Sequence, residues 1–155
     1  MCFWKSEESK VLVAKRDITV YKLGCFASSN LFYPIYRTAY CYYKNKIVKE
    51  DVTFNDGMLT KGFHSYISCI IKPYKKNCDA IPYLLHAVSA NNLHLNILFC
   101  KNDNVFLAKF IIPKGAVYCV NRGNEVISNS IVYTGNYIKL EGTMNFNVKD
   151  IWKEK

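Results

Sequence analysis

The segment from Phe106 to Tyr133 constrains the fold of this chain more than any other. Three runs of β-branched and aromatic residues are separated there by Pro-Lys-Gly at 113–115 and by Asn-Arg-Gly-Asn at 121–124. Pro, Gly and Asn are typical of turns, because they end a ladder of strand hydrogen bonds or accept a positive φ angle. The segment therefore predicts a β-meander, with residues 136–142 as one further strand.

Apolar runs earlier in the chain predict additional strands. Residues 11–14 and 18–23 read as two short strands around a charged turn. An aromatic strand is expected to begin after Pro34 and to form a hairpin with residues 47–54 through the polar turn at 44–46. A second hairpin is expected between residues 93–100 and 105–112, which flank a polar connection.

One segment has the pattern of a helix. Within residues 79–90, Asp79 can act as the N-cap, Pro82 suits the first turn, and apolar residues recur at helical spacing at Ile81, Leu84, Leu85 and Val88. The predicted fold is therefore α+β and mainly β. We expect a curved antiparallel sheet or a partly closed barrel, with this one short helix against it. The 155 residues contain no linker or repeat, so a single domain over 1–155 is expected.

The charge is strongly positive, with 21 Lys and Arg against 12 Asp and Glu and a net charge of +9. This balance favours an anionic partner, such as a nucleotide-like ligand or an acidic protein, and leaves nucleic acid open. The basic residues are dispersed, however, and include Lys44, Lys46 and Lys49 without forming a run of five, so they also fit an ordinary solvated surface.

Cysteine usage and the N-terminal sequence bear on the compartment. The seven cysteines are irregularly spaced, and the first ten residues carry acidic groups without the apolar stretch of a signal peptide. We therefore expect a cytoplasmic protein whose thiols stay reduced and pack as small hydrophobes. No run approaches the roughly 18 apolar residues of a membrane span, and no His or Cys spacing matches a familiar zinc site. No membrane, metal or cofactor is expected.

The first candidate site is the segment 62–66, where a glycine precedes several polar side chains. His64 and Tyr66 would share one face of a strand, and Ser65 would lie on the other face with Phe63. These residues could line a ligand pocket. They could equally be hydrogen-bonded residues of an ordinary sheet.

Two arginines are further candidates. Arg37 lies within an aromatic run, so its guanidinium could hold a phosphate while a tyrosine such as Tyr40 stacks on a base. Arg122 lies in the turn at 121–124 and could add a second guanidinium. The alternatives are that Arg37 packs across strands with its head in water and that Arg122 is an ordinary exposed turn residue.

The motifs GFHSY at 62–66, IPKGAVYCVN at 112–121 and EVISNSIVY at 125–133 resemble a pattern of small uncharacterised proteins of bacteriophages and mobile elements. The resemblance covers residues 21–133. It implies no known activity. A phage origin would imply inhibition, sequestration or remodelling of a host factor.

The chain also has a fainter similarity to ADP-ribosyltransferases, in which Arg or His on an early strand, Ser or Tyr on a second strand, and a Glu near a late strand surround a nicotinamide dinucleotide. Arg37 or His64 and Ser65 or Tyr66 would take the first two places, and the segment IIPKG at 111–115 the third. The late strand at 106–110 carries no carboxylate, and Glu125 falls in a turn context after the next strand, so the Glu that would stabilise an oxocarbenium ion is missing.

No phosphate-binding loop, dinucleotide fingerprint or nucleophile elbow occurs in the sequence. The expectation is therefore a non-enzymatic binding protein that engages an anionic partner. The alternatives are an ADP-ribosyltransferase-like enzyme and a nucleic-acid-binding or structural virion protein.

Overall fold

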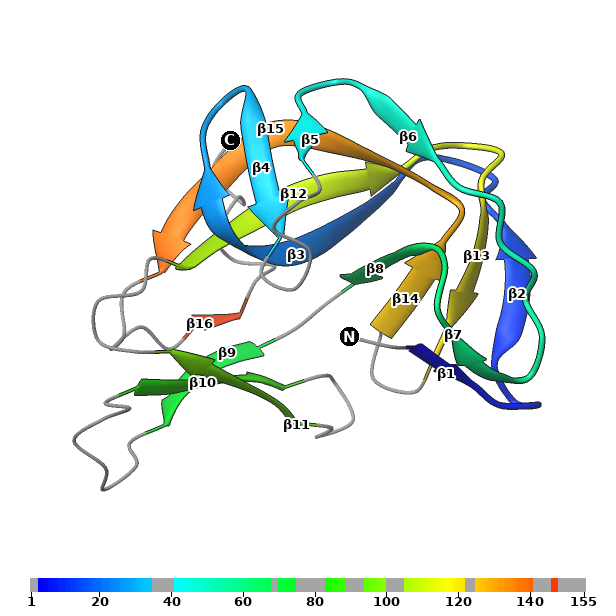
Figure 1. Cartoon of the computed structure of the whole chain (residues 1–155), viewed down its shortest axis with the longest axis horizontal. Coiled ribbons are helices and arrows are strands. Elements are labelled where there is room, and N and C mark those ends of the chain that lie inside the picture. Colours follow the sequence, from blue (N-terminus) through cyan, green and yellow to red (C-terminus); the bar gives the residue numbers. More distant parts are fainter. Residues whose placement is uncertain are drawn as a thin grey trace.

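The computed structural model describes residues 3–34, 41–67, 70–74, 83–88, 94–99, 105–121, 125–140 and 146–147 (Figure 1). Its regular elements in these ranges are all β-strands. The mainly β, antiparallel prediction is confirmed. Arg37, Tyr40 and Arg122 lie outside the described residues.

Ten strands form one antiparallel sheet. Its main path runs through β2 (Lys10–Val13), β13 (Val117–Val120), β14 (Glu125–Ser128), β8 (Phe63–Tyr66), β3 (Ile18–Ala27), β12 (Val105–Ile112), β15 (Ser130–Leu140) and β6 (Ile47–Lys49). Off this path, β4 (Leu31–Pro34) pairs with β3, and β5 (Tyr42–Tyr43) pairs with β4. Among the described strands the path is open, with β2 at one end and β6 at the other, so the sheet is not closed into a barrel.

Two smaller antiparallel sheets accompany it. One is a ribbon of β1 (Phe3–Lys5) and β7 (Gly57–Leu59). The other has the order β11 (His94–Phe99), β10 (Tyr83–Val88), β9 (Ile70–Tyr74) and β16 (Phe146–Asn147). In Figure 1 the long strands β3, β12 and β15 bend together across the large sheet.

The predicted helix is wrong where the structure describes it. Residues 83–88 form β10, in which Leu84 lies opposite Tyr74 of β9 and Leu98 of β11. A short apolar run fits a helix or a strand equally well, and two flanking strands satisfy its backbone groups on both sides, whereas an isolated helix of this length is marginal. Residues 79–82 and 89–90 lie outside the described residues.

Several predicted strand pairings are also wrong, although the strands exist. In the expected meander only β13 and β14 pair with each other, because β12 pairs with β3 and β15, and β14 pairs with β8. Likewise β5 pairs with β4, and β6 with β15, in place of the hairpin around residues 44–46. The strands β11 and β12 belong to different sheets. Of the predicted strand at 136–142, residues 136–140 form the end of the single long strand β15, and residues 141–142 lie outside the described residues.

The core of the large sheet is built around Phe110 of β12, whose side chain is fully buried. Its ring centroid lies 5.1 Å from the centroids of Phe32, Tyr42 and Tyr133. These three rings come from β4, β5 and β15, so one aromatic cluster joins strands that are distant in sequence. The Tyr133 hydroxyl donates a hydrogen bond to the Ser28 carbonyl at 2.7 Å, and burial raises the pKa of Tyr133 to about 12.

A close approach of two strands brings Phe32 into this cluster. A Cβ on Gly24 of β3 would lie 2.4 Å from the carbonyl oxygen of Tyr33 and 2.5 Å from the Phe32 ring. The register between β3 and β4 shifts at this point, between Gly24 and Phe26. Glycine is therefore needed here for space, since any side chain would push β4 off the core.

The strands β14 and β8 separate two apolar clusters. Phe63 and Val126 belong to the main core, whereas Ile127 packs on the opposite side with Phe3 and Leu59 of the β1–β7 ribbon. The ribbon thus covers the outer face of this part of the large sheet. Within the described residues there is no helix long and apolar enough to span a membrane.

Replacing Phe110 tests the role of the aromatic cluster. We expect Phe110→Ala to lower the free energy of unfolding by about 3–5 kcal/mol, because a buried ring is removed from contact with three others. Urea denaturation measures the loss. Phe26→Ala is the matched control, since Phe26 is 46% exposed, and it should cost much less. Equal losses for the two variants would contradict the assigned core.

Candidate functional site

The alternation predicted for residues 63–66 is confirmed in β8. The His64 and Tyr66 rings meet edge to face on one side of the strand, with centroids 5.1 Å apart. Phe63 points to the opposite side, where its ring centroid lies 6.2 Å from that of Tyr42. Ser65 is fully buried, and among the described residues its hydroxyl has no hydrogen-bond partner. The three candidates of this segment therefore do not share one surface.

The side chain of His64 is hydrogen-bonded to Glu125, a residue that the sequence pattern assigned to a turn. Its Nε2 lies 2.6 Å from Oε1 of Glu125, and the two side chains are only 17% and 23% exposed. Glu125 is the first residue of β14, not part of a turn. In the register of β14 with β8 it lies opposite Tyr66, and so diagonally across from His64. The adjacent β-branched residues Val126 and Ile127 could have signalled that this strand begins at Glu125.

The imidazole of His64 is held in its neutral form. Burial lowers the pKa of His64, and this effect exceeds the opposing hydrogen bond and charge of Glu125. The charge of Lys22 lowers the pKa further. A neutral imidazole can bind a carboxylate only as a donor, so the proton lies on Nε2 and points to Glu125.

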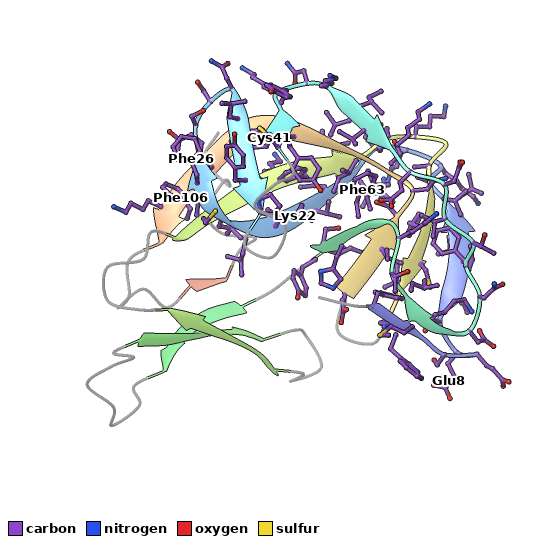
Figure 2. All side chains as sticks on the ribbon, viewed as in Figure 1. Glu8, Lys22, Phe26, Cys41, Phe63 and Phe106 are labelled. Carbon is purple, nitrogen blue, oxygen red and sulfur yellow. The ribbon has the colours of Figure 1, made fainter. Side chains whose placement is uncertain are left out.

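Lys22 of β3 connects this pair to the aromatic core. Its Nζ donates a hydrogen bond to the His64 carbonyl and lies 5.6 Å from the centroid of the Tyr42 ring and 6.0 Å from that of Phe110. Figure 2 shows Lys22 on β3 in the central part of the large sheet. Sequence analysis missed Lys22, because the weak alternation of residues 18–23 does not fix which face of the strand is buried.

An open depression of about 640 Å³ adjoins Glu125 on the side of the β1–β7 ribbon. It is lined by Trp4, Ser6, Glu8, Ser9, Val120, Asn121 and Glu125. Asn121 holds one wall of the depression in place, since its Nδ2 donates a hydrogen bond to the Trp4 carbonyl at 2.8 Å and its Oδ1 accepts one from the Ser9 hydroxyl at 2.5 Å. Both charged side chains in this described lining are carboxylates. The depression therefore does not suit an anion.

A second surface carries the opposite charge. Lys44, Lys46 and Lys49 are exposed on the connection between β5 and β6 and on β6 itself. The side chains of Tyr43 and Ile47 lie among them, each 52% exposed, and Lys46 Nζ is 5.6 Å from the centroid of the Tyr43 ring. We refer to residues 43–49 as the Lys44–Lys49 surface. In the sequence these lysines look like part of the dispersed charge.

A local turn presents this surface. Asn45 has a φ of 61°, and its N–H donates at 2.8 Å to the carbonyl of Tyr133 in β15. Lys46 N–H donates back to the Tyr43 carbonyl at 3.2 Å. The turn is therefore anchored to the large sheet next to the aromatic core, and the lysine side chains project from a fixed backbone.

Neither a metal centre nor a cysteine pair stands out in the described ranges. They hold no group of three or more His, Cys, Asp or Glu side chains that could bind a metal ion. Cys25, Cys41 and Cys119 are free thiols. Cys119 is buried in the cluster with Phe3 and Ile127, and burial raises the pKa of its thiol, so it packs as a hydrophobe.

Comparison with protein-family models, with curated proteins and with solved structures finds no match for this chain.

The neutral state of His64 makes stability depend on pH. Because the folded-state pKa lies below the unfolded value of about 6.5, the unfolded chain binds more protons below that pH. The contribution of His64 to the free energy of unfolding is fully present above about pH 6.5 and is lost as the pH falls below that value. We expect His64→Gln to flatten the fall in unfolding free energy between about pH 8 and pH 5, as measured by urea denaturation. His86 and His94 are unchanged in both proteins, so an identical pH slope would refute a buried neutral His64.

Proposed function

We propose that the protein is a non-enzymatic binding protein that engages an anionic partner through the Lys44–Lys49 surface. The observation that carries the proposal is the grouping of three exposed lysines with the exposed side chains of Tyr43 and Ile47. Exposed apolar and aromatic area beside positive charge gives both contact energy and attraction to a negative surface. The net charge of +9 adds long-range attraction to the same kind of partner.

An acidic protein fits this surface better than a nucleotide does. Small ligands bind in concave sites that bury most of their surface, whereas these lysines project from a turn and an edge strand. Ammonium groups on flexible stems can adapt to a cluster of carboxylates. The resemblance to small phage proteins points to the same class of partner. In that setting, the protein would inhibit or sequester an acidic host factor.

The residues that the sequence suggested for ligand binding do not all contribute to this proposal. His64 is engaged with Glu125, and Ser65 is buried, so neither is offered as a contact to the acidic partner. Arg37, Tyr40 and Arg122 lie outside the described residues and remain proposed contributors. The aromatic and basic character that singled out Arg37 and Tyr40 also marks the Lys44–Lys49 surface a few residues later in the chain.

Charge reversal tests this surface. We expect the wild-type protein to bind a fluorescent Glu-rich peptide at low ionic strength, with an affinity that falls as salt is added. The triple variant K44E/K46E/K49E should lose at least about tenfold in affinity by fluorescence anisotropy. K15E/K61E/K114E changes the net charge equally at exposed positions and should lose less than about threefold.

Equal losses for the two triple variants would show that only net charge matters, and the surface would be wrongly assigned. A single-stranded oligonucleotide measured in parallel addresses the nucleic-acid alternative. Tighter and more salt-dependent binding of the oligonucleotide would favour that alternative.

One observation favours the enzyme as a second candidate. The structure supplies a carboxylate near His64 and Tyr66, which the sequence pattern lacked, and Glu125 also reaches the depression lined by Trp4 and Asn121. A His, Tyr and Glu set is what the similarity to ADP-ribosyltransferases implies. Against it, the carboxylate already accepts a hydrogen bond from His64.

Nicotinamide release separates the two candidates. The binding proposal predicts that the wild-type protein, incubated with NAD, releases no more nicotinamide than buffer does, as measured by liquid chromatography. Glu125→Gln is the matched variant, because it keeps the shape of the side chain but removes the charge that would stabilise an oxocarbenium ion. Release by the wild type that disappears in Glu125→Gln would establish the enzyme instead.

A further inference from the structure

Strand β2, at one end of the large sheet, has no neighbour on its outer edge among the described strands and carries an apolar surface. All four residues of β2 are exposed, and Val11, Leu12 and Val13 retain 43%, 41% and 59% of their accessible surface. On its inner edge β2 pairs with β13, and among the described strands no other strand adjoins it. An apolar edge strand is a template for pairing with another strand.

The hydrogen bonds around β2 show which of its backbone groups face outward. Ala14 N–H donates to the Ala116 carbonyl at 2.8 Å, so Ala14 faces β13. The backbone N–H and C=O of Val117 instead bond to Asn129 at 3.0 Å, on the side away from β2. Val117 lies opposite Val13, and the pattern alternates along an antiparallel pair. The N–H and C=O groups of Val11 and Val13 therefore point out of the sheet edge.

The two ends of the sheet differ in this respect. At the opposite end, β6 has an exposed lysine at Lys49, with Lys44 and Lys46 in the turn before it. Lysines on an edge discourage the addition of another strand. Strand β2 also has an exposed lysine, at its first residue Lys10, but its other three residues, Val11 to Val13, carry no charge, so most of this edge lacks the same protection.

We propose that β2 pairs antiparallel with β2 of a second copy of this chain, about a two-fold axis at Leu12. In this register Leu12 faces Leu12 of the second copy, and Val11 of each chain lies opposite Val13 of the other. Both outward-facing residues of each strand then exchange hydrogen bonds with the other strand, as a self-complementary interface requires.

The charged residues on either side of β2 favour a second copy of the chain as the partner of this edge. Arg16 lies in the bend after β2 and Glu8 in the turn before it, and both residues are exposed; a two-fold axis at Leu12 brings Arg16 of one copy to the same end of the pair as Glu8 of the other. Opposite charges of the two copies thus lie at each end of the pair, outside the paired strands. The Lys44–Lys49 surface belongs to β5, β6 and the connection between them, and it is not part of this strand pairing.

Sedimentation velocity over a range of protein concentrations tests the dimer. We expect the wild type to dimerise and Val13→Pro to be monomeric, because proline removes an outward N–H without removing a bond to β13. V11K/V13K should also be monomeric, since it places lysines on the edge without changing the backbone. Ile47→Lys, at the opposite edge, is the control and should dimerise as the wild type does. Circular dichroism confirms that each variant is folded.

Cysteine substitution tests the register. Two residues in a non-hydrogen-bonded pair have Cα atoms about 4.5 Å apart, within the range of a disulfide. Leu12→Cys should therefore give a disulfide-linked dimer under mild oxidation, whereas Val13→Cys should not, because Val13 is offset from its own copy. The unsubstituted chain, with the exposed Cys25, sets the background. A monomeric wild type, dimers that persist in V11K/V13K, or equal cross-linking of the two cysteine variants would overturn the proposal.

Discussion

The contact of Phe110 with three other rings is the interaction on which the rest of the structure depends. It joins β12 to β4, β5 and β15, which no local turn would bring together. The chain must close long loops before these rings can meet, so burial of the cluster has to offset a large entropy cost. The turn at 44–46 is held against β15 beside the cluster, and Lys22 spans from its rings to the His64 carbonyl. Both candidate sites are therefore positioned by this cluster.

The two candidate sites have opposite electrostatic character. Near β8, the carboxylate of Glu125 takes the hydrogen bond of a neutral imidazole, and the adjoining depression adds Glu8. Three exposed lysines gather instead on the Lys44–Lys49 surface. The net charge alone could not distinguish these two regions, because a chain with a net charge of +9 can still have local groups of acidic side chains. The anionic partner that the composition suggests is thus better placed on the turn than on the histidine.

Local signals in the sequence predicted local structure well. The strands near residues 11–14 and 18–23, the turn at 113–115 and the alternation of residues 63–66 depend on neighbouring residues alone. Pairing of distant strands could not be predicted, because it is decided by which apolar faces pack together. Residues 83–88 form a strand for this reason, since β9 and β11 flank them. The carboxylate of Glu125 was missed because its contact with His64 crosses between strands 61 positions apart.

We propose that an acidic partner binds the Lys44–Lys49 surface and not the depression near Glu125. Nuclear magnetic resonance of the uniformly labelled protein, titrated with a Glu-rich peptide, tests it most directly, because each backbone amide reports its own environment. We predict that the amide signals of residues 43–49 shift progressively and that those of Trp4, Ser6 and Asn121 stay in place. Shifts confined to Trp4, Ser6 and Asn121 would contradict the account.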